Sequence, residues 1–408
     1  MKREMRILFV TPHVPSLLRD RPRQFLRHLA GRGHQVTLVV LARPGERQEP
    51  LSEVRQWCRD MTVVPVSWVG AARGCLRSLP GPMPLNVAFF ASKETRRTLR
   101  RLETSSYDVA HLEHLRTAQY APILAGLPRL YDSVDCLTLL WSRTLRAGQW
   151  RGRALAAWEL WKTRRYERQA LGWMDGAVAT TEADCAALRG LAPVLPVRAV
   201  PNGVDSDYFR LGPDLSDGRT LVFLGNMRYH ANVASVLDFV RRMMPLVWER
   251  HPRSRLLIVG ADPPAEVQRL DRDVRIIVTG YVKDVRPYLL RATVAVSPVL
   301  YGAGVQTKVL ECMAAGLPVV ASAQACSGLG ARPGQHLLSA TDPVEWAEAI
   351  SGLLEFAGLR RRLGIVGRDY VVRHHSWQES VSRLEEAYEE VIRRREQLVA
   401  AGGLERVA

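Results

Sequence analysis

The sequence lacks the cysteine patterns that mark disulfide frameworks and zinc sites. Its six cysteines form no Cys-x-x-Cys pair and have no histidine at metal-ligand spacing; they are Cys58, Cys75, Cys136, Cys185, Cys312 and Cys326. A reduced compartment without a structural zinc ion accounts for this pattern. We therefore expect a cytoplasmic protein and no bound metal.

Long apolar runs are also missing. No stretch reaches the roughly eighteen uninterrupted apolar residues of a membrane-spanning helix. The N-terminal run MRILFV, residues 5–10, is too short for a secretory signal and leads into Thr-Pro without a small-residue cleavage site. We expect neither a leader nor a spanning helix, and attachment to the inner face of the cell membrane stays open.

Acidic residues are too few to balance the basic ones. The 57 Lys and Arg against 41 Asp and Glu give a formal net charge of +16. This excess favours anionic partners such as nucleic acid, acidic lipid or phosphorylated small molecules, but arginines scattered over solvated helix faces explain it equally well. Because no basic block or recognition module is visible, nucleic acid is not an expected partner.

No internal repeat or low-complexity segment interrupts a regular alternation of short apolar runs and helical segments. Such alternation predicts buried parallel strands with crossover helices, an α/β fold. The expected strands are 5–10, 35–41, 61–66, 108–112, 129–132, 176–180 and 197–200 in one half, and 220–225, 255–260, 274–280, 293–298, 317–322 and 336–339 in the other.

The length and the pause in this pattern predict two domains. A chain of 408 residues can form two cores of about 200 residues each. The Pro-, Gly- and Asp-rich stretch 201–219 separates the halves, so we expect doubly wound α/β domains over 1–203 and 204–375.

The last segment, 376–408, predicts a long helix. Ser376 and Glu379 have the spacing of a capping box. The apolar residues Trp377, Val381, Leu384, Tyr388 and Val391 repeat at helical spacing, so this helix is expected to pack on another part of the chain.

The stretch YGAGVQTKVLECMAAGLPVVAS, residues 301–322, indicates an anion site. Gly302 and Gly304 allow backbone N–H groups to approach a phosphate, and the following helix presents its positive end to the same place. Lys308 adds a charge that opposes the helix dipole and therefore suggests a bound anion. One turn after Thr307, Glu311 can accept two hydroxyl groups of a ribose. These residues alone also allow an alternative without a ligand, in which Glu311 is a solvated helix residue and the glycines only form a turn.

Four segments carry a family resemblance. PNGVDSDYF, FLGNMRYHANVASVLDF, TGYVKDVRPYLLRATVAVSP and GAGVQTKVLECMAAGLPVVAS together resemble the family 4 retaining glycosyltransferases of GT-B fold, and more narrowly the sugar transferases of bacterial exopolysaccharide and exosortase (PEP-CTERM) loci. The resemblance covers nearly the whole chain and is most specific over 200–325. It implies two Rossmann-like domains facing a cleft, with the acceptor on 1–203, a nucleotide-sugar donor on 204–375 and the C-terminal helix crossing back to the N-terminal domain.

The resemblance implies a donor site with no cofactor beyond the nucleoside-diphosphate sugar itself. In such enzymes the second glutamate of an E-x7-E motif binds the donor ribose, a role that falls on Glu311. The expected donor-binding residues are Gly225, Asn226, Arg228, His230, Tyr281, Gly302, Ala303, Gly304, Val305, Gln306, Thr307, Lys308 and Glu311.

The donor motifs depart from the family pattern at three positions. Ala303 stands where the first glutamate of E-x7-E is expected, and Asn226 and Ala231 stand where the broad family carries Arg and Lys for the diphosphate. Arg228, His230 and Lys308 can supply that charge instead. The departures leave open a subfamily with its own donor geometry or a protein with little catalysis.

The acceptor side rests on residues that follow strands of the first half. DVAHLEHLRTAQY and YDSVDCLTLLWSR resemble loops that line the acceptor side in the family. The expected acceptor residues are Arg19, Arg23, His111, Glu113, His114, Asp132 and Asp135, each with a structural role as its alternative.

The expected catalytic groups are Glu311, Lys308, Arg228, His114 and Glu113. Charge builds up on the departing diphosphate, so donors fixed around it supply most of the acceleration. Retention in this fold is usually ascribed to front-face attack in which the leaving phosphate takes the acceptor proton, so neither a protein nucleophile nor a metal is needed. The Asp-x-Asp stretches at 205–207 and 271–273 are interpreted as structural.

Three functional hypotheses remain. The first is a glycosyltransferase (EC 2.4) that uses a nucleotide sugar and a glycan or lipid-linked acceptor in exopolysaccharide or cell-surface glycan synthesis. A sugar-nucleotide epimerase of the same architecture and a non-catalytic nucleotide-binding scaffold are the alternatives. The Trp- and Arg-rich stretch 149–175 suggests peripheral membrane contact, although its tryptophans and cations interleave around the helix.

Overall fold

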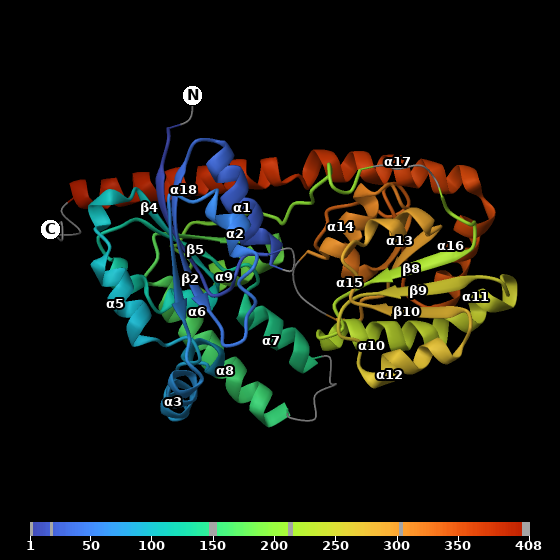
Figure 1. The fold of residues 1–408 in the computed structure, drawn as a ribbon, viewed down its shortest axis with the longest axis horizontal. Coiled ribbons are helices and arrows are strands. Elements are labelled where there is room, and N and C mark those ends of the chain that lie inside the picture. The colour runs from blue at the N-terminus through green and yellow to red at the C-terminus, as the bar shows by residue number, and fades with distance from the viewer. Residues whose placement is uncertain (1–2, 17–18, 147–152, 211–214, 302–304, 402–408) are drawn as a thin grey trace. The chain divides into compact units, whose positions relative to one another are not determined.

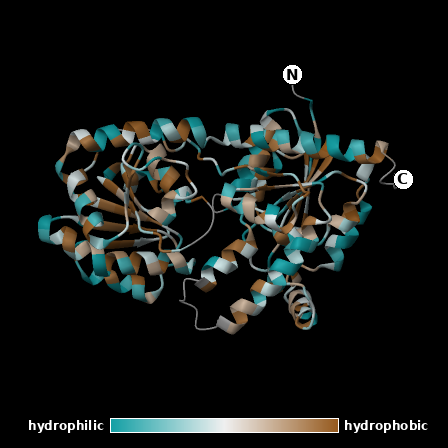
Figure 2. Cartoon of the chain, turned by 180° about the vertical axis from the view of Figure 1, so that it is seen from behind, coloured by the Kyte–Doolittle hydropathy of each residue, from teal (hydrophilic) through white to brown (hydrophobic). Residues whose placement is uncertain are grey.

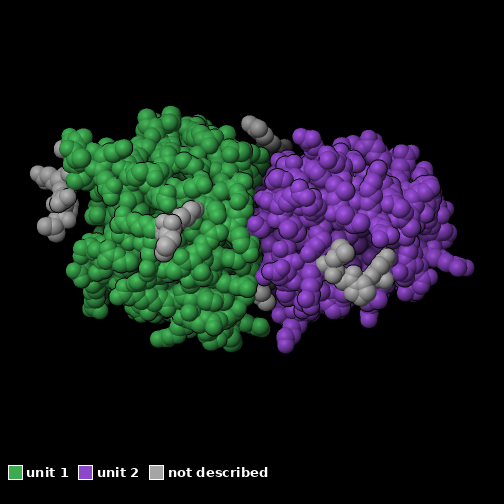
Figure 3. All heavy atoms as spheres, turned by 90° about the horizontal axis from the view of Figure 1, so that it is seen from above, with its two compact units in different colours: residues 1–201, 377–408 green, residues 202–376 purple. Residues whose placement is uncertain are grey.

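The computed structural model describes all of the chain except residues 1–2, 17–18, 147–152, 211–214, 302–304 and 402–408. The chain forms two compact units, which Figure 3 shows in different colours. Unit 1 contains residues 1–201 and 377–408, and unit 2 contains residues 202–376.

Unit 1 is built on a parallel seven-stranded sheet of order β3-β2-β1-β4-β5-β6-β7 (Figure 1). The strands are β1 (Arg6–Thr11), β2 (Gln35–Ala42), β3 (Asp60–Pro65), β4 (Val109–Glu113), β5 (Arg129–Asp132), β6 (Gly176–Ala179) and β7 (Val197–Ala199). The strand order reverses between β1 and β4, and the loops that leave these strands at such a point diverge and leave room for a ligand.

Helices cover both faces of this sheet. One face packs against α1 (Asp20–Gly31) and α18 (Trp377–Ala400), with α2 (Leu51–Arg55) beside them. The other face packs against the helices between β3 and β7. These are α3 (Trp68–Ser78), α4 (Leu85–Ala88), α5 (Lys93–Arg101), α6 (His114–Ala118), α7 (Leu137–Arg146), α8 (Arg153–Leu171) and α9 (Glu182–Leu191), with 3-10 turns at Thr104–Ser106 and Ala121–Leu124.

The C-terminal helix α18 completes the core of unit 1. The five apolar residues that the sequence places on one helix face are all buried: Trp377, Val381, Leu384, Tyr388 and Val391. They share one cluster with α1 and with β1, β2 and β4. The most C-terminal described segment of the chain is therefore an integral layer of unit 1.

Unit 2 repeats the same plan with a parallel six-stranded sheet of order β10-β9-β8-β11-β12-β13. The strands are β8 (Thr220–Leu224), β9 (Arg255–Val259), β10 (Ile276–Gly280), β11 (Val294–Ser297), β12 (Val319–Ser322) and β13 (Leu338–Ala340). Its reversal point lies between β8 and β11. Figure 2 shows the strands of both sheets as mostly hydrophobic, as expected for sheets that are covered on both faces.

The helices of unit 2 lie on both faces of its sheet, in two separate clusters. They are α10 (His230–Asp238), α11 (Met244–Arg250), α12 (Ala265–Gln268), α13 (Arg286–Arg291), α14 (Thr307–Ala314), α15 (Ala323–Cys326), α16 (Pro343–Glu355) and α17 (Ala357–His374). A π-helical turn at Phe239–Met243 joins α10 to α11, and a 3-10 turn spans Arg269–Arg272.

The fold expected from the sequence is confirmed as two Rossmann-like parallel-sheet domains. Every predicted strand is present, and each observed boundary lies within two residues of the predicted one. The six cysteines are free thiols. Within the described residues, no helix combines the length and the hydropathy that crossing a membrane requires.

Candidate functional site

Two glycines bring the loops after β8 and β9 into contact, next to the reversal point of the unit 2 sheet. A Cβ atom on Gly260 would lie 1.7 Å from the carbonyl oxygen of Gly225, so only glycine fits there. The backbone N–H of Gly225 donates to the carbonyl of Val259 at 3.0 Å, and that of Met227 donates to the carbonyl of Ala261 at 2.9 Å. The chain after β8 is thus held against the end of β9.

Lys308 connects α14 to this loop. Its Nζ donates to Oδ1 of Asn232 at 2.7 Å, and the side-chain amide of Asn232 donates in turn to the carbonyl of Asn226 at 2.9 Å. Burial lowers the pKa of Lys308 to about 8, against the opposing charges of Cys312 and Glu311. The lysine is therefore a half-buried cation, and its hydrogen-bonded neighbour is a neutral amide.

Asn232 is a site residue that sequence reasoning missed. The resemblance directed attention to position 231, but Ala231 is buried in the core of unit 2. Its neighbour Asn232, one position further along α10, points to Lys308. The direction of the side chains on the first turn of α10 decides which of the two residues faces Lys308. A single sequence gives no signal for that direction.

Two further predicted donor residues lie at the same strand ends but are more exposed. Arg228 pairs with Asp262 at 2.7 Å, and its side chain is 77% exposed. His230 Nδ1 lies 2.9 Å from the hydroxyl of Tyr301, on which its ring is stacked. Burial lowers the pKa of His230.

Most of the remaining predicted donor residues lie on α14 or directly before it. Val305 is buried, Thr307 is exposed and Glu311 is half-buried, close enough to Lys308 to raise its pKa against the effect of burial. Gln306 stands at the N-cap position without capping α14 through its side chain. Tyr281 follows β10 and is 68% exposed. Gly302, Ala303 and Gly304 lie outside the described residues.

In unit 1, basic side chains that follow β1, β2 and β4 form a cluster around His13. Arg116 Nη1 lies 2.7 Å from Nε2 of His13, and Arg43 Nη2 lies 3.3 Å from its Nδ1. Burial, then the charges of Arg19 and Arg116, lower the pKa of His13 so far that the ring is neutral. Of these residues, only Arg19 was expected from the sequence.

The cluster has little negative charge to balance it. Glu46 accepts the backbone N–H groups of Val14 at 3.2 Å and Arg43 at 3.0 Å. Glu113, at the end of β4, is buried, and this burial together with the charge of Asp132 raises its pKa to about 7. Near neutral pH, Glu113 is therefore only partly ionised.

His114 follows Glu113 with a backbone φ of 67°, an uncommon conformation for a residue other than glycine. Its ring stands edge-on to His13, with ring centroids 6.2 Å apart. Burial lowers its pKa well below the usual value, so it is neutral. Strained backbone of this kind clusters at functional sites.

His111 and Asp132 differ from what we expected, because both are fully buried. His111 Nε2 lies 3.6 Å from Asp132, and its Nδ1 lies 2.9 Å from the hydroxyl of Tyr388 on α18. Asp132 also accepts two hydrogen bonds from Arg21, at 2.9 and 3.1 Å. This buried network joins α1, α18 and the sheet, so the prediction that these two residues contact an acceptor is corrected to a structural role.

Arg23 and Asp135 are also held within the fold. Arg23 pairs with Glu53 at 2.6 Å and with Asp20 at 3.4 Å, and its side chain is only 12% exposed. Asp135 accepts a hydrogen bond from the hydroxyl of Thr180 at 3.4 Å, and burial raises its pKa to about 6. Neither residue contacts the cluster around His13 through any of these bonds.

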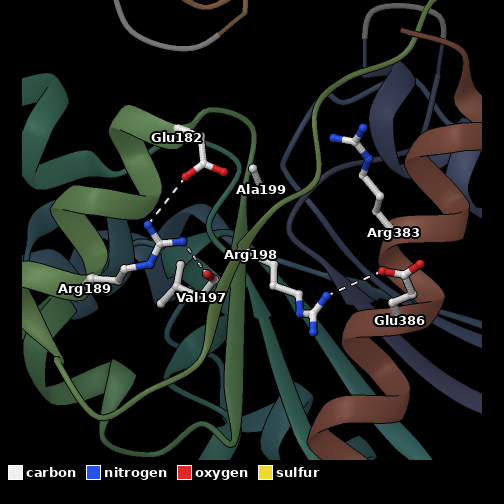
Figure 4. A pocket seen from close by; sticks show the side chains of 7 residues that line it. All are labelled: Glu182, Arg189, Val197, Arg198, Ala199, Arg383 and Glu386. Atoms are coloured by element: carbon white, nitrogen blue, oxygen red, sulfur yellow. Dashed lines mark hydrogen bonds and ion pairs between the residues drawn. The ribbon is translucent and has the colours of Figure 1, made fainter. Parts of the chain in front are cut away.

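A hollow of about 280 Å³ lies beside edge strand β7, between α9 and α18 (Figure 4). Its arginines already have partners: Arg189 pairs with Glu182 at 3.5 Å, and Arg198 pairs with Glu386 at 3.5 Å. The third arginine of the hollow, Arg383, pairs with Glu379 at 2.9 Å. Because all three arginines already have carboxylate partners, the hollow does not present a candidate site. The described residues also hold no group of three or more His, Cys, Asp or Glu side chains that could bind a metal ion.

Comparison with known proteins finds glycosyltransferase matches over most of the chain. Residues 23–208 match the family model described as "Glycosyltransferase Family 4", and residues 218–355 match the one described as "Glycosyl transferases group 1". The chain is 31% identical over 204 residues to a phosphatidyl-myo-inositol mannosyltransferase of Mycobacterium leprae (strain TN). That match covers 47% of this chain and 53% of the relative, so the chain spans about half the length of the curated relative it matches.

Solved structures share the fold at low sequence identity. A sucrose-phosphate synthase from Thermosynechococcus elongatus superposes with a TM-score of 0.69 at 18% identity, covering 98% of this chain and 100% of the other. Anabaena HepE in complex with UDP and glucose gives a TM-score of 0.66 at 13% identity, covering 95% and 100%.

The two matched regions together cover most of the chain, although His13 and Arg19 of the unit 1 cluster precede the first of them. The protein is a glycosyltransferase of the family 4 type with the GT-B fold.

Proposed function

We propose that this protein transfers a sugar from a nucleoside-diphosphate sugar to a hydroxyl group of a glycan or lipid-linked acceptor, with retention of anomeric configuration. The proposal includes a role in bacterial exopolysaccharide or cell-surface glycan synthesis, in the cytoplasm. The observation that carries it is the half-buried Lys308, hydrogen-bonded to Asn232 at the reversal point of the unit 2 sheet.

The donor diphosphate would lie beside Lys308. A half-buried lysine whose hydrogen-bond partner is an amide leaves its charge available to a ligand. The loop after β8 and the N-terminus of α14 meet at Lys308, and helix N-termini favour anions. Glu311, one turn further along α14, would accept the ribose hydroxyl groups.

In the proposed mechanism, these groups act on the leaving diphosphate. As the anomeric bond breaks, negative charge grows on the phosphate, and a preorganised cation nearby stabilises the transition state more than the ground state. The leaving phosphate takes the proton of the attacking hydroxyl on the same face of the sugar. His114 and Glu113 would contact the acceptor side of the reaction, and no nucleophile of the protein is required.

The experiment is a calorimetric titration of wild type and Glu311→Ala with UDP and GDP, with EDTA present throughout. One nucleotide is expected to bind to wild type and to lose roughly ten- to hundredfold in affinity in the variant, because hydrogen bonds to a charged group are lost. Glu348→Ala, an exposed glutamate on α16, is the matched control and should bind as wild type does.

The outcomes separate this proposal from its alternatives. Absence of binding, or dependence on added Mg²⁺, would contradict a metal-free donor site at Glu311. Binding without turnover of any nucleotide sugar would favour a scaffold. Interconversion of nucleotide sugars without an acceptor would favour an epimerase.

Peripheral membrane contact is part of the proposal, and α3 and α8 support it. The two helices are neighbours, since Lys162 on α8 donates to the carbonyl of Ser78 on α3 at 2.6 Å. We call the exposed apolar residues of these helices, together with Leu79 directly after α3, the α3–α8 patch: Trp68, Val69, Leu76, Leu79, Leu155 and Trp161. Exposed arginines on both helices accompany it, and mixed aromatic and basic surfaces favour anionic lipid interfaces.

A further inference from the structure

The cluster around His13 contains more hydrogen-bond donors than its own acceptors can satisfy. A neutral imidazole has one N–H donor and one acceptor nitrogen. Guanidinium groups face both ring nitrogens of His13, Arg116 at 2.7 Å and Arg43 at 3.3 Å. Whichever tautomer forms, one guanidinium faces an N–H group and needs another acceptor.

Several buried polar atoms at this place have no partner among the described residues. These atoms are Nε of Arg116, Nδ1 of His114 and Oε2 of Glu113. Burying a polar atom without a partner costs free energy, so such atoms in a functional region suggest a missing ligand.

The nearby acids balance the positive charge of the cluster only in part, since Arg43 is paired with Glu46 at 3.9 Å. Burial, then the neighbouring Arg43 and Arg19, lower the pKa of Arg116 to about 10, which shows how poorly its charge is compensated. Glu46 and the partly ionised Glu113 are the acids that act on it, and they oppose three guanidinium groups. An added anion would restore the balance.

The shape of the cluster favours a phosphoryl group over a carboxylate. One guanidinium satisfies a planar carboxylate through two parallel bonds, whereas a phosphate offers several oxygens in different directions. Here the guanidinium groups come from three separate segments, after β1, after β2 and on α6. Arg19 is exposed and can meet a ligand that arrives from solvent.

We propose that Arg19, Arg43 and Arg116, with His13 and His114, bind a phosphoryl group carried by the acceptor, which makes the acceptor a phosphorylated glycan or a lipid-linked phosphate. This inference rests on the proposed glycosyltransferase function and names its acceptor class. It differs from the donor site, which lies in unit 2.

The test is a titration with inorganic phosphate at pH 7 and constant ionic strength. Phosphate could also enter the proposed diphosphate site, so every variant is made in a Lys308→Gln background. Phosphate is expected to bind to that background protein and to lose roughly tenfold or more in affinity in Arg116→Gln and in Arg43→Gln. Arg198→Gln, an arginine of the hollow in Figure 4, is the matched control and should change nothing.

Two comparisons make the result decisive. Acetate should bind at least tenfold more weakly than phosphate, and equal affinity would overturn the preference for a phosphoryl group. UDP affinity, measured with Lys308 intact, should not change in Arg116→Gln, and a parallel loss of UDP affinity would assign the cluster to the donor instead. Arg43→Gln lies at a partly exposed position, so it keeps the test valid if Arg116→Gln fails to fold.

Failure of this inference and failure of the proposed function give different results. Unchanged phosphate affinity in both arginine variants would overturn the phosphoryl site alone, provided that UDP still binds through Glu311. Loss of nucleotide binding in wild type would contradict the donor site while phosphate binding at Arg116 could still be measured. If the acceptor is a lipid-linked phosphate, vesicles that contain a phosphomonoester lipid should compete with free phosphate for the cluster. If the acceptor is a soluble phosphorylated glycan, that glycan should compete and the vesicles should not.

Discussion

At the scale of single residues, Lys308 occupies an unfavourable position for a cation. It is the second residue of α14, where the helix dipole repels positive charge, and burial lowers its pKa to about 8. A lysine in such a position is a candidate for binding or catalysis, and the proposed diphosphate would offset both costs.

This position predicts a pH dependence of nucleotide binding. Because the pKa of Lys308 is about 8 in the free protein and a bound diphosphate would raise it, the affinity should be constant below pH 8 and fall above it, by up to about tenfold per pH unit. The phosphates lose their last proton near pH 6, so they do not titrate in this range. Titration of UDP between pH 7 and 9.5 measures the effect.

Lys308→Arg should remove this pH dependence, since a guanidinium keeps its proton throughout the range. Lys283→Gln, at an exposed lysine after β10, should leave the pH profile as in wild type. The same decline in Lys308→Arg as in wild type would contradict the assignment to Lys308.

Residue identities in the two sites could be predicted only in part. The sequence directed attention to Lys308 and Glu311 because they follow a glycine-spaced loop within one continuous motif. His13, Arg43 and Arg116 come from three separate strand ends, and only the order of β2, β1 and β4 brings them together. His111 and Asp132 were expected at an acceptor because they occur at strand ends, but their side chains turn into the core.

At the scale of elements, the strands were predictable because buried parallel strands are short continuous apolar runs with helices between them. Helix α18 was equally predictable from the spacing of its apolar residues. That spacing did not indicate which surface the helix covers. The structure shows this surface to be α1 and the β4–β6 part of the sheet. Gly176 on β6 illustrates how close the packing is, because a Cβ atom there would lie 2.5 Å from Val391 on α18.

Helix α18 should therefore contribute strongly to the stability of unit 1. Leu384→Ala leaves a cavity in a fully buried position and should lower the free energy of unfolding by about 2–5 kcal/mol. Arg393→Ala, at an exposed position on the same helix, should change it by less than about 0.5 kcal/mol. Amide hydrogen exchange in β5 and β6 measures the change locally, and equal exchange in both variants would contradict a core role for α18.

At the scale of the whole molecule, the net charge of +16 and the α3–α8 patch would act together in the proposed membrane contact. Apolar residues that insert at an interface provide binding that salt does not weaken, whereas arginines attract anionic lipid only within a screening length of about 8 Å at physiological salt. Membrane binding by charge alone would disappear at high salt, whereas binding by charge and by inserted apolar residues would persist in part.

Sedimentation with vesicles of anionic lipid distinguishes these cases. Wild type should bind at low salt and keep a measurable fraction of that binding at about 0.5 M salt, where the screening length is shorter than at physiological ionic strength. A double variant with Trp68→Ser and Trp161→Ser should lose the salt-resistant fraction, since it removes two exposed aromatic side chains of the patch. Phe356→Ser, at an exposed phenylalanine of unit 2 that is outside the patch, should bind as wild type does. Salt-resistant binding that survives in the double variant would assign the membrane contact to another surface, and no binding of wild type to anionic vesicles at low salt would contradict peripheral attachment.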